Sequence, residues 1–317
     1  MRKEIVVIQI PAFNEEENIG NTINECIEVM QNQEYKYKII VIDDGSTDGT
    51  LTECLKFKDI IVYQLKQNKG LAYAFQFGID EALKLGATVI VNLDADGQYP
   101  VIKIPKLIEP IINKECDVVI GDRKVREVLE FSIWKKFLQL LGTYVVNRFT
   151  GLKVLDATSG FRSYNAEAAA WLNISTNFTY TLESLVQLSI GKYKIKSIYC
   201  SRNIVTRKSR LFKNNFQYIL RNGSTLVRVW TLYKPKILFT TLSMSYLFVS
   251  LILSIPFIIS KVNNNNAQHI QLVVFSGVFV IVGYVTYLIG MILDSQKNSR
   301  IMTQKIIQRN KLLDRRT

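Results

Sequence analysis

Two long stretches without a single charged residue lie near the end of this 317-residue chain. They run from Ile237 to Ser260 and from Ile270 to Leu293. At about 1.5 Å per residue, a helix of either length crosses a hydrocarbon core of roughly 30 Å. Helices buried in a soluble core usually keep a polar face, which neither stretch has. We therefore predict a two-helix transmembrane hairpin over residues 237–293, with a pair of buried core helices as the alternative.

Basic residues are concentrated on one side of the hairpin, since the connection on the other side contains one lysine, Lys261. The connection over residues 261–269 is short and rich in asparagine, whereas Lys234 and Lys236 precede the first stretch and a basic tail at residues 294–317 follows the second. The positive-inside rule then places both termini and the residues before the hairpin in the cytoplasm. No signal peptide is expected. We predict a multi-pass protein of the cell membrane, or of the endoplasmic reticulum membrane in a eukaryote.

The net charge of +13 is concentrated close to the predicted hairpin. The excess of Lys and Arg is densest from Lys192 to the first apolar stretch and again in the tail. This distribution favours an anionic membrane surface over nucleic acid as the partner. Residues 212–236 mix aromatic side chains with cations, which is typical of juxtamembrane amphipathic helices. A helix packed on the soluble part of the chain is the alternative for that segment.

Residues 1–121 alternate short β-branched runs with helical patterns. The apolar runs are IVVIQI, KIIVID, IIVYQL, TVIVNL and DVVIG. Helical patterns separate them over residues 15–30, 48–57 and 71–85. This rhythm is typical of an α/β domain with a mostly parallel sheet and helices on both faces. We assign the domain to residues 1–211 and expect ligands at the carboxyl ends of its strands.

Polar clusters follow three of the predicted strands: PAFNEEEN, DDGSTDGT and DADGQ. The first two have a local explanation, because Asn14 and Asp48 are suitable helix caps. Gly45 and Gly49 suit backbone with positive φ. Capping does not explain the adjacent aspartates at residues 43–44, since one carboxylate is enough to cap a helix. The convergence of all three clusters on strand ends predicts a ligand site.

Asp94 and Asp96 stand where an apolar run leaves the predicted core. In an extended D-x-D segment the two carboxylates lie on the same side, and Gln98 is next along on that side. Carboxylate and amide oxygens suit a hard cation such as Mg²⁺ or Mn²⁺, together with diphosphate and water. A solvated turn is the alternative. The four cysteines are widely spaced without a C-x-x-C pair, which argues against a zinc site.

These motifs together resemble the family 2 glycosyltransferases of GT-A (Rossmann-like) fold, and more narrowly the polyprenyl-phosphate glycosyltransferases. The matching segments are PAFNEEENI, VIDDGSTDGT, QNKGLAYAFQFGI, LDADGQ, GDR at residues 121–123 and DATSGFR at residues 156–162. They occur in the order usual for the family and cover most of residues 5–211. The resemblance implies a nucleotide-sugar donor, a polyprenyl-phosphate acceptor and a metal ion, and family members often form homo-oligomers.

The resemblance also implies roles for individual residues. The implied nucleotide-sugar-binding residues are Pro11, Phe13, Glu15, Ile42, Asp44, Asp94, Ala95 and Asp96. Asp94, Asp96 and Gln98 would hold Mg²⁺ or Mn²⁺ against the diphosphate of the donor. Arg123 would contact a phosphate of the donor or the acceptor, so that Asp94, Asp96 and Arg123 form the implied catalytic set.

A basic loop precedes the membrane segments in the resembled family. Here the corresponding stretch is SRNIVTRKSRL, which lacks the glycine usual in that loop. The residues that the resemblance offers for the acceptor phosphate, besides Arg123, are Arg202, Arg207 and Arg210.

A lipid phosphate is a nucleophile that needs no general base, because its second pKa near 6 leaves it largely dianionic at neutral pH. The one histidine, His269, falls in the predicted outer turn. Glu183 is interpreted as a positioning residue. Arg123, Lys124 and Arg126 precede an apolar, aromatic segment suited to a membrane surface, and arginine binds phosphate through its planar fork of donors.

We therefore predict metal-dependent, inverting transfer of one sugar from a GDP- or UDP-hexose to a dolichyl or undecaprenyl phosphate at the cytoplasmic membrane face. The inversion is implied by the resemblance alone. One alternative is a membrane glycosyltransferase acting on a saccharide hydroxyl, although no Q-x-x-R-W motif is present. Another is a nucleotide-binding membrane scaffold without catalysis, against which the intact D-x-D counts. A dinucleotide oxidoreductase is disfavoured, since no G-x-G-x-x-G follows the first strand.

Overall fold

The computed structural model describes residues 4–125, 133–174, 180–201, 203, 231, 234–263 and 269–315. The side chains at residues 133–135 and 149 are outside this description. The chain divides into two compact units, one of residues 1–220 with 304–317 and the other of residues 221–303. Most of the juxtamembrane segment predicted at residues 212–236 lies outside the described residues.

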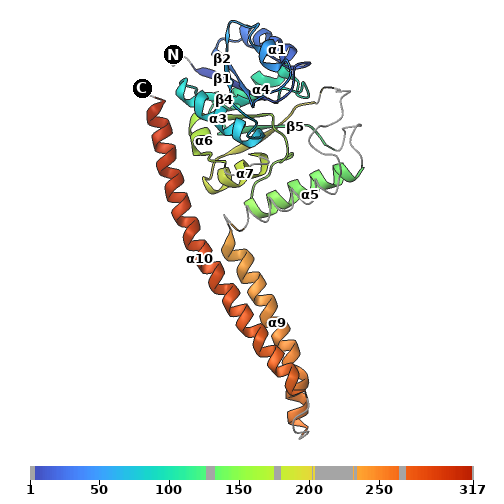
Figure 1. Cartoon of the computed structure of the whole chain (residues 1–317). Helices are drawn as coiled ribbons and strands as arrows, with labels where there is room; N and C mark the ends of the chain where they lie inside the picture. The colour runs from blue at the N-terminus through green and yellow to red at the C-terminus, as the bar shows by residue number, and fades with distance from the viewer. Residues whose placement is uncertain are drawn as a thin grey trace. The chain divides into compact units, whose positions relative to one another are not determined.

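A seven-stranded sheet forms the centre of the first unit (Figure 1). Its strands are β1 (Ile5–Ala12), β2 (Lys36–Asp43), β3 (Ile60–Gln64), β4 (Val89–Asn92), β5 (Val118–Asp122), β6 (Arg162–Asn165) and β7 (Ile195–Tyr199). They lie in the order β3-β2-β1-β4-β6-β5-β7, and neighbours are parallel except where β6 pairs with β4 and β5. The predicted α/β architecture with a mostly parallel sheet is confirmed.

Helices connect and cover these strands. They are α1 (Ile19–Gln31), α2 (Thr50–Cys54), α3 (Leu71–Lys84), α4 (Ile104–Ile112) with the short 3₁₀ helix η1 (Val101–Lys103) before it, α5 (Ile133–Thr150), α6 (Ala166–Trp171) and α7 (Tyr180–Ile190). Helix α3 begins at the predicted residue. Helices α1 and α2 both begin later than predicted, because the polar residues before them form loops rather than first helical turns.

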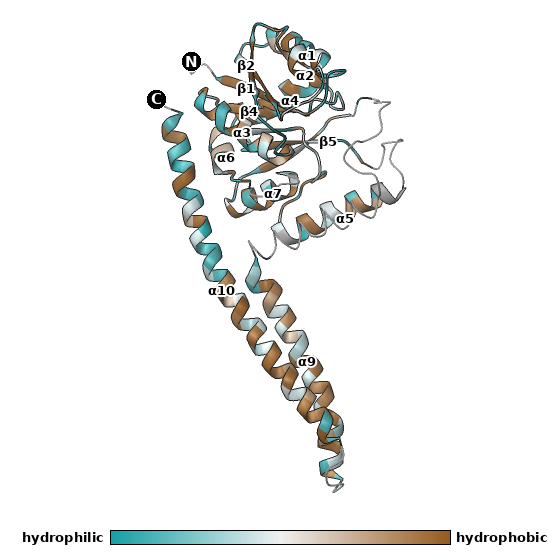
Figure 2. Ribbon diagram, viewed as in Figure 1, coloured by the Kyte–Doolittle hydropathy of each residue, from teal (hydrophilic) through white to brown (hydrophobic). Residues whose placement is uncertain are grey.

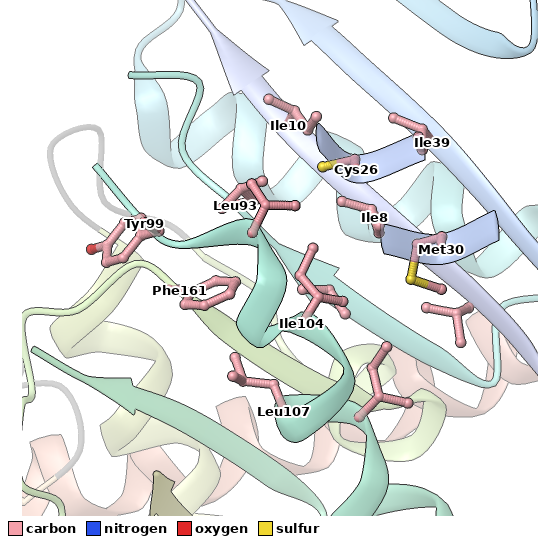
Figure 3. Close-up of a cluster of buried hydrophobic side chains, with 14 of the residues drawn as sticks. Ile8, Ile10, Cys26, Met30, Ile39, Leu93, Tyr99, Ile104, Leu107 and Phe161 are labelled. Carbon is pink, nitrogen blue, oxygen red and sulfur yellow. The ribbon is translucent and has the colours of Figure 1, made fainter. Parts of the chain in front are cut away.

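The main apolar core lies on one face of the sheet. Ile8 and Ile10 of β1 and Ile39 of β2 pack with Met30 of α1 and Ile104 of α4 (Figure 3). Each of these side chains is completely or almost completely buried. Burying a side chain of this size stabilises the fold by roughly 1.5–3 kcal/mol. Side chains alternate between the two faces of β1, so Ile8 and Ile10, two residues apart, both pack into this core.

The opposite face carries two polar side chains inside otherwise apolar strands. Gln9 of β1 and Asn92 of β4 are fully buried, and Gln9 Nε2 donates to Asn92 Oδ1 at 2.8 Å. Helix α3 covers this face so closely that a Cβ on Gly78 would overlap Gln9 Oε1. Buried polar groups require partners. The further partners of Asn92 lead to the candidate site.

The second unit is built on two long helices, α9 (Pro235–Val262) and the first part of α10 (Ile270–Asp314). Both are long and apolar enough to cross a membrane (Figure 2). Small residues one heptad apart form their contact: Ser243 Oγ donates to the Gly283 carbonyl at 2.7 Å, and Ser250 Oγ donates to the Ser276 carbonyl at 3.0 Å. Such residues let apolar helices approach closely where no hydrophobic force drives them together.

The last part of α10 packs on the first unit. Gln304 is buried there, and its Nε2 donates to the Trp171 carbonyl and to Gln187 Oε1, each at 2.8 Å. Lys311 Nζ lies 2.7 Å from Asp80 Oδ1 of α3. The segment predicted as a basic tail is thus helical as far as Asp314, and part of it belongs to the sheet domain.

Candidate active site

The three polar clusters meet at one edge of the sheet. Strands β2, β1 and β4 are consecutive neighbours and run parallel, so their carboxyl ends lie side by side (Figure 1). Each of the three strands is followed directly by one of the clusters. Ligands of open α/β sheets bind at this edge.

Hydrogen bonds join the loops after β1 and β2 to each other. The Asn14 amide donates to Ser46 Oγ at 2.9 Å, and Asn14 Oδ1 accepts from the Thr47 amide at 2.8 Å. Glu16 Oε2 accepts from the Gly49 amide at 2.7 Å. Asn14 has φ +55° and does not cap a helix, so that prediction was wrong. Its polar side chain is used between loops instead, because α1 begins only at Ile19.

The loop after β2 follows the sequence prediction in part. Asp48 Oδ1 accepts from the Thr50 amide at 3.0 Å at the start of α2, but the residue at the N-cap position is Gly49 and not the predicted Asp48. Gly45 has φ +70°, and a Cβ there would lie 2.7 Å from the Gln67 carbonyl carbon. Gly49 has φ −74°, so the expectation of positive φ there was wrong. Its backbone is that of an ordinary residue beginning a helix.

Asp43 and Asp44 have different partners, which explains why two carboxylates stand together. Asp43 Oδ1 accepts from the Ser46 amide at 3.0 Å within its own loop. Asp44 accepts from the Lys69 amide through Oδ1 and from the Gly70 amide through Oδ2, each at 2.8 Å. Burial raises the pKa of Asp44, although these two amides oppose the effect. Asp44 therefore ties the second polar cluster to the loop before α3.

The D-x-D segment forms a turn rather than the extended backbone that we predicted. Strand β4 ends at Asn92, Gly97 has φ +68°, and the Gln98 amide donates to Asp96 Oδ1 at 3.1 Å. An aspartate readily forms such a turn with the backbone two residues on. Asn203, which follows β7, holds the turn through Nδ2 to the Gly97 carbonyl at 3.1 Å. The turn, and not strand alternation, sets how the two carboxylates are presented.

Asp94 lies in an environment that suits a cation. Burial raises the pKa of Asp94 to about 7, with a further contribution from the neighbouring Asp96, while Arg123 and Arg162 oppose the rise. Its Oδ1 is buried and has no hydrogen-bond partner in the part of the chain that the structure describes. A divalent ion would relieve the repulsion between the two carboxylates and occupy the free oxygen. The donor set therefore fits Mg²⁺ or Mn²⁺.

Further ligands for such an ion are few among the protein side chains. Within the described ranges, no cluster of three or more His, Cys, Asp or Glu side chains could hold a metal. Gln98, two residues after Asp96, is partly exposed. A metal bound here would need oxygens from an amide, water or a diphosphate, which is the ligand set that Mg²⁺ usually takes.

Residues that the sequence analysis missed lie beneath Asp94. Asn92 Nδ2 donates to the Tyr180 hydroxyl and to the Gly160 carbonyl, each at 2.8 Å. A Cβ on Gly160 would lie 2.6 Å from Asp94 Oδ2, which explains why the DATSGFR motif has glycine at this position. Asn92 carried a detectable signal, since a polar residue inside a buried apolar strand needs a partner. Tyr180 carried none.

Arg123 is a buried ion-pair residue rather than a free surface cation. Its Nε lies 2.7 Å from Asp156 Oδ2, and its Nη2 donates to Thr158 Oγ1 at 2.7 Å. Burial disfavours its charge, but Tyr99 and Asp156 outweigh this effect and raise the pKa of Arg123 above its usual value. The ion pair links the GDR and DATSGFR motifs. Arg123 also contributes positive charge to the surroundings of Asp94.

The other predicted nucleotide-binding residues lie at the same sheet edge. Pro11 and Ile42 are buried at the ends of β1 and β2, and Phe13 is 41% exposed. The Glu15 amide donates to Thr50 Oγ1 at 2.7 Å, and the buried Ala95 lies in the D-x-D turn. The sequence motifs therefore mark one contiguous edge.

Most of the cations predicted for phosphate binding fall in segments that the structure does not describe. Arg126, Arg202, Arg207 and Arg210 lie outside the described residues. Lys124 Nζ lies 4.4 Å from the centre of the Tyr199 ring.

Glu183, which the sequence analysis interpreted as a positioning residue, is fully buried in α7. Its Oε1 accepts from Gln187 Nε2 at 3.1 Å.

Comparison with known proteins assigns the chain to a family. The model of glycosyl transferase family 2 matches residues 7–171. This chain belongs to that family. The glycosyltransferase is 31% identical over 225 residues to a UDP-N-acetylglucosamine–dolichyl-phosphate N-acetylglucosaminyltransferase of Methanococcus voltae. The aligned residues cover 63% of this chain and 88% of that protein. It is also 28% identical over 168 residues to an undecaprenyl-phosphate mannosyltransferase of Micrococcus luteus. Here the aligned residues cover 51% of this chain and 67% of that protein.

Solved structures show the same fold. Glucosyl-3-phosphoglycerate synthase from Mycobacterium tuberculosis, crystallised with Mn²⁺, UDP and phosphoglyceric acid, superposes with a TM-score of 0.54 and 17% identity, covering 72% of this chain and 77% of that one. The same enzyme has also been crystallised with Mg²⁺ and UDP. The GT-A-like fold of this glycosyltransferase is therefore shared with an enzyme that binds a divalent ion and a nucleotide.

Proposed function

We propose that this glycosyltransferase moves one sugar from a nucleotide sugar to a polyprenyl phosphate at the cytoplasmic face of a membrane. The observation that carries the proposal is the acidic pair at the end of β4, where Asp94 keeps a buried oxygen without a partner among the described residues. Relatives named for transfer to dolichyl and undecaprenyl phosphate support the acceptor class.

The donor binds along the edge formed by the ends of β1, β2 and β4. Asp94, Asp96 and Gln98 would hold Mg²⁺ or Mn²⁺, which when bound neutralises charge on the leaving diphosphate. The proposed residues for the nucleotide sugar are Pro11, Phe13, Glu15, Ile42, Asp44, Asp94, Ala95 and Asp96. In support, Phe13 exposes its ring at this edge, while the contacts of Asp44 keep the loop after β2 in place.

The acceptor supplies its own nucleophile. A phosphate monoester is largely dianionic at neutral pH, so its oxygen attacks the anomeric carbon without a protein base. Attack opposite the leaving nucleotide inverts the configuration. Arg123 stabilises phosphate charge from beside Asp94, and Arg202, Arg207 and Arg210 are the further candidates for the lipid phosphate. Asn203 belongs to the same basic stretch as these three arginines. It supports this assignment, since its amide donates to the Gln98 carbonyl at 3.0 Å and so joins the start of the stretch to the D-x-D turn.

Two kinds of surface would contact the membrane. Helices α9 and α10 expose mostly apolar side chains over their membrane-length parts. Helix α5 exposes Phe137, Leu141 and Tyr144 on one side and ends near Arg148. An amphipathic helix with aromatic residues and cations suits the headgroup region of a bilayer.

The proposal is tested with the purified full-length protein. It is incubated with GDP- and UDP-sugars and with dolichyl or undecaprenyl phosphate, with and without Mn²⁺, and products are identified by mass spectrometry. We expect one nucleotide sugar to give a polyprenyl-phosphate-linked hexose only when Mn²⁺ or Mg²⁺ is present. Release of the nucleotide without transfer to either lipid phosphate would contradict the proposed acceptor, and nucleotide binding without any turnover would favour a scaffold.

A further inference from the structure

The sheet edge that carries the acidic pair continues beyond the proposed donor residues. Strand β6 runs antiparallel to β4 and β5, and β7 runs parallel to β5, so β4, β5 and β7 share one direction. Their carboxyl ends therefore lie at the same edge, with Asp94 after β4, Arg123 after β5 and Tyr199 at the end of β7. The proposed donor residues lie where β2, β1 and β4 end. The ends of β5 and β7 remain for the acceptor.

Two large apolar side chains are exposed beside the end of β7. Tyr199 is 48% exposed and Leu155 is 60% exposed. Side chains two residues apart on a strand lie on the same face, so Tyr199 and Ser197 share one face of β7. The Leu155 amide donates to Ser197 Oγ at 3.2 Å, which holds Leu155 on that side of the sheet. Leu155 and Tyr199 therefore belong to one exposed surface.

A cation lies over this surface. Lys124 Nζ is 4.4 Å from the centre of the Tyr199 ring. The backbone of Lys124 has φ +47°, which is uncommon for a residue with a side chain, and its amide donates to Asp122 Oδ1 at 2.9 Å. Backbone of this kind is concentrated at ligand sites. A single exposed apolar residue needs no explanation, but an aromatic ring, a leucine and a cation at one strand end do.

Arg123 gives this surface a phosphate-binding neighbour. It directly precedes Lys124, and its Nε and Nη2 donate to Asp156 and Thr158. Its Nη1 has no hydrogen-bond partner in the ranges that the structure describes, so one nitrogen of the guanidinium is left for an anion. Asp156 directly follows Leu155, and the ion pair therefore joins the chain segments of Lys124 and Leu155. A phosphate at Arg123 has the exposed apolar surface beside it.

A ligand that matches this arrangement carries a phosphate bonded directly to a hydrocarbon chain. Inorganic phosphate and sugar hydroxyls have no part for the apolar side chains, and a wholly apolar partner would bury the Lys124 charge without a counter-ion. We infer that Lys124, Leu155 and Tyr199 form the subsite for the isoprene units next to the acceptor phosphate. Tyr199 and Leu155 contact the hydrocarbon, and Lys124 faces the phosphate. The inference rests on the proposed function, for which it names residues that bind the acceptor chain.

The test measures KM for the acceptor, using the full-length protein in detergent and the nucleotide sugar that the wild type uses. Undecaprenyl phosphate is compared with farnesyl phosphate, which keeps the isoprene units next to the phosphate and lacks the long tail. Tyr199→Ser and Leu155→Ser each remove apolar contact, so each should raise KM for both acceptors by about tenfold. KM for the nucleotide sugar should stay that of the wild type, which shows that the fold is intact. Tyr199→Phe keeps the ring and should raise KM much less than Tyr199→Ser.

Leu55→Ser is the matched control. Leu55 directly follows α2 and is 66% exposed, so the change removes the same kind of exposed side chain elsewhere on the domain. It should leave KM for both acceptors at the wild-type value. An equal rise of KM in this control would show that the effect is not local and would overturn the subsite.

The two acceptors separate this inference from the proposed function. Wild-type KM for farnesyl phosphate in both Tyr199→Ser and Leu155→Ser would refute the subsite and leave the proposed function standing. A rise confined to undecaprenyl phosphate, or a wild type that uses undecaprenyl phosphate alone, would place recognition in the long tail and also refute it. If the wild type transfers sugar to neither acceptor, the proposed function fails and the subsite with it.

Discussion

Arg123 and Asp156 form a buried ion pair with two hydrogen bonds, from Nε to Oδ2 at 2.7 Å and from Nη2 to Oδ1 at 3.1 Å. The first residue belongs to GDR and the second to DATSGFR, so two separate motifs meet in one interaction. Thr158 Oγ1 accepts a further bond from the same guanidinium. The pair fixes the direction of a cation that the proposed function needs beside the acidic pair.

Replacing Asp156 with Asn should destabilise the first unit. The change leaves the Arg123 charge buried without its counter-ion, and breaking a buried pair from one side typically costs about 3 kcal/mol or more. Thermal unfolding of the full-length protein, followed by tryptophan fluorescence, measures the effect. The exposed pair Lys196–Glu115 offers a control, since Glu115→Gln removes the same kind of charge at the surface and should leave the unfolding temperature nearly unchanged. Equal losses in the two variants would contradict a special role for the buried pair.

The same pair predicts a pH dependence of stability. Burial raises the pKa of Asp156, but Arg123 outweighs burial and the net pKa is lowered in the folded state. A carboxylate with a depressed pKa contributes its stabilisation above its unfolded value of about 3.9, and loses it as pH falls through the folded pKa. The stability difference between wild type and Asp156→Asn should therefore be constant near neutral pH and shrink below about pH 4. Unfolding temperatures measured from pH 7 to pH 3 check this, and a difference that grows on acidification would contradict it.

Asp96→Asn should abolish metal-dependent turnover while the fold is retained. The amide keeps the size of the side chain, and its oxygen can still accept from the Gln98 amide, but the charge that attracts the ion is lost. The assay is sugar transfer at several Mn²⁺ concentrations. Glu53→Gln serves as the control, because Glu53 of α2 forms an ion pair with the exposed Lys56 just after that helix. Unchanged activity in Asp96→Asn would remove Asp96 from the metal site.

Gly160→Ala should displace the Asp94 carboxylate. The new Cβ would lie 2.6 Å from Oδ2, closer than real Cβ contacts, so the carboxylate must move. We expect Mn²⁺ affinity to fall by about tenfold or more. Gly142→Ala in α5 is the matched control, since no heavy atom lies within 4 Å of a Cβ there and alanine favours helix. Normal Mn²⁺ affinity in Gly160→Ala would mean that Asp94 is free to adapt.

Gln304→Ala should loosen the packing of α10 on the sheet domain. The amide of Gln304 is buried between the Trp171 carbonyl and Gln187 Oε1, so its loss leaves two buried acceptors with fewer partners. The expected loss of stability is about 1–3 kcal/mol. Thr303→Ala, one residue earlier on the exposed side of the helix, should have little effect. Identical unfolding temperatures for the two variants would show that this end of α10 is only a tail.

The α/β fold was predictable because its signals are local. Apolar runs with β-branched residues predicted β1 to β5, and polar clusters at three strand ends predicted a ligand site at one edge of the sheet. Helix starts were less predictable. Asn14 has the properties of a cap, yet its side chain bonds to the loop after β2, which is a competing partner distant in sequence.

The sequence alone determined which residue types stand at the strand ends and where two membrane-length helices lie, because periodicity and composition act within a few turns of the chain. Only the tertiary structure decided which carboxylate oxygens are free. Asp44 is occupied by the amides of Lys69 and Gly70, whereas the buried Asp94 Oδ1 has no hydrogen-bond partner in the part of the chain that the structure describes. The physical reason is that a hydrogen-bond partner far along the chain is chosen by packing, which no local pattern records.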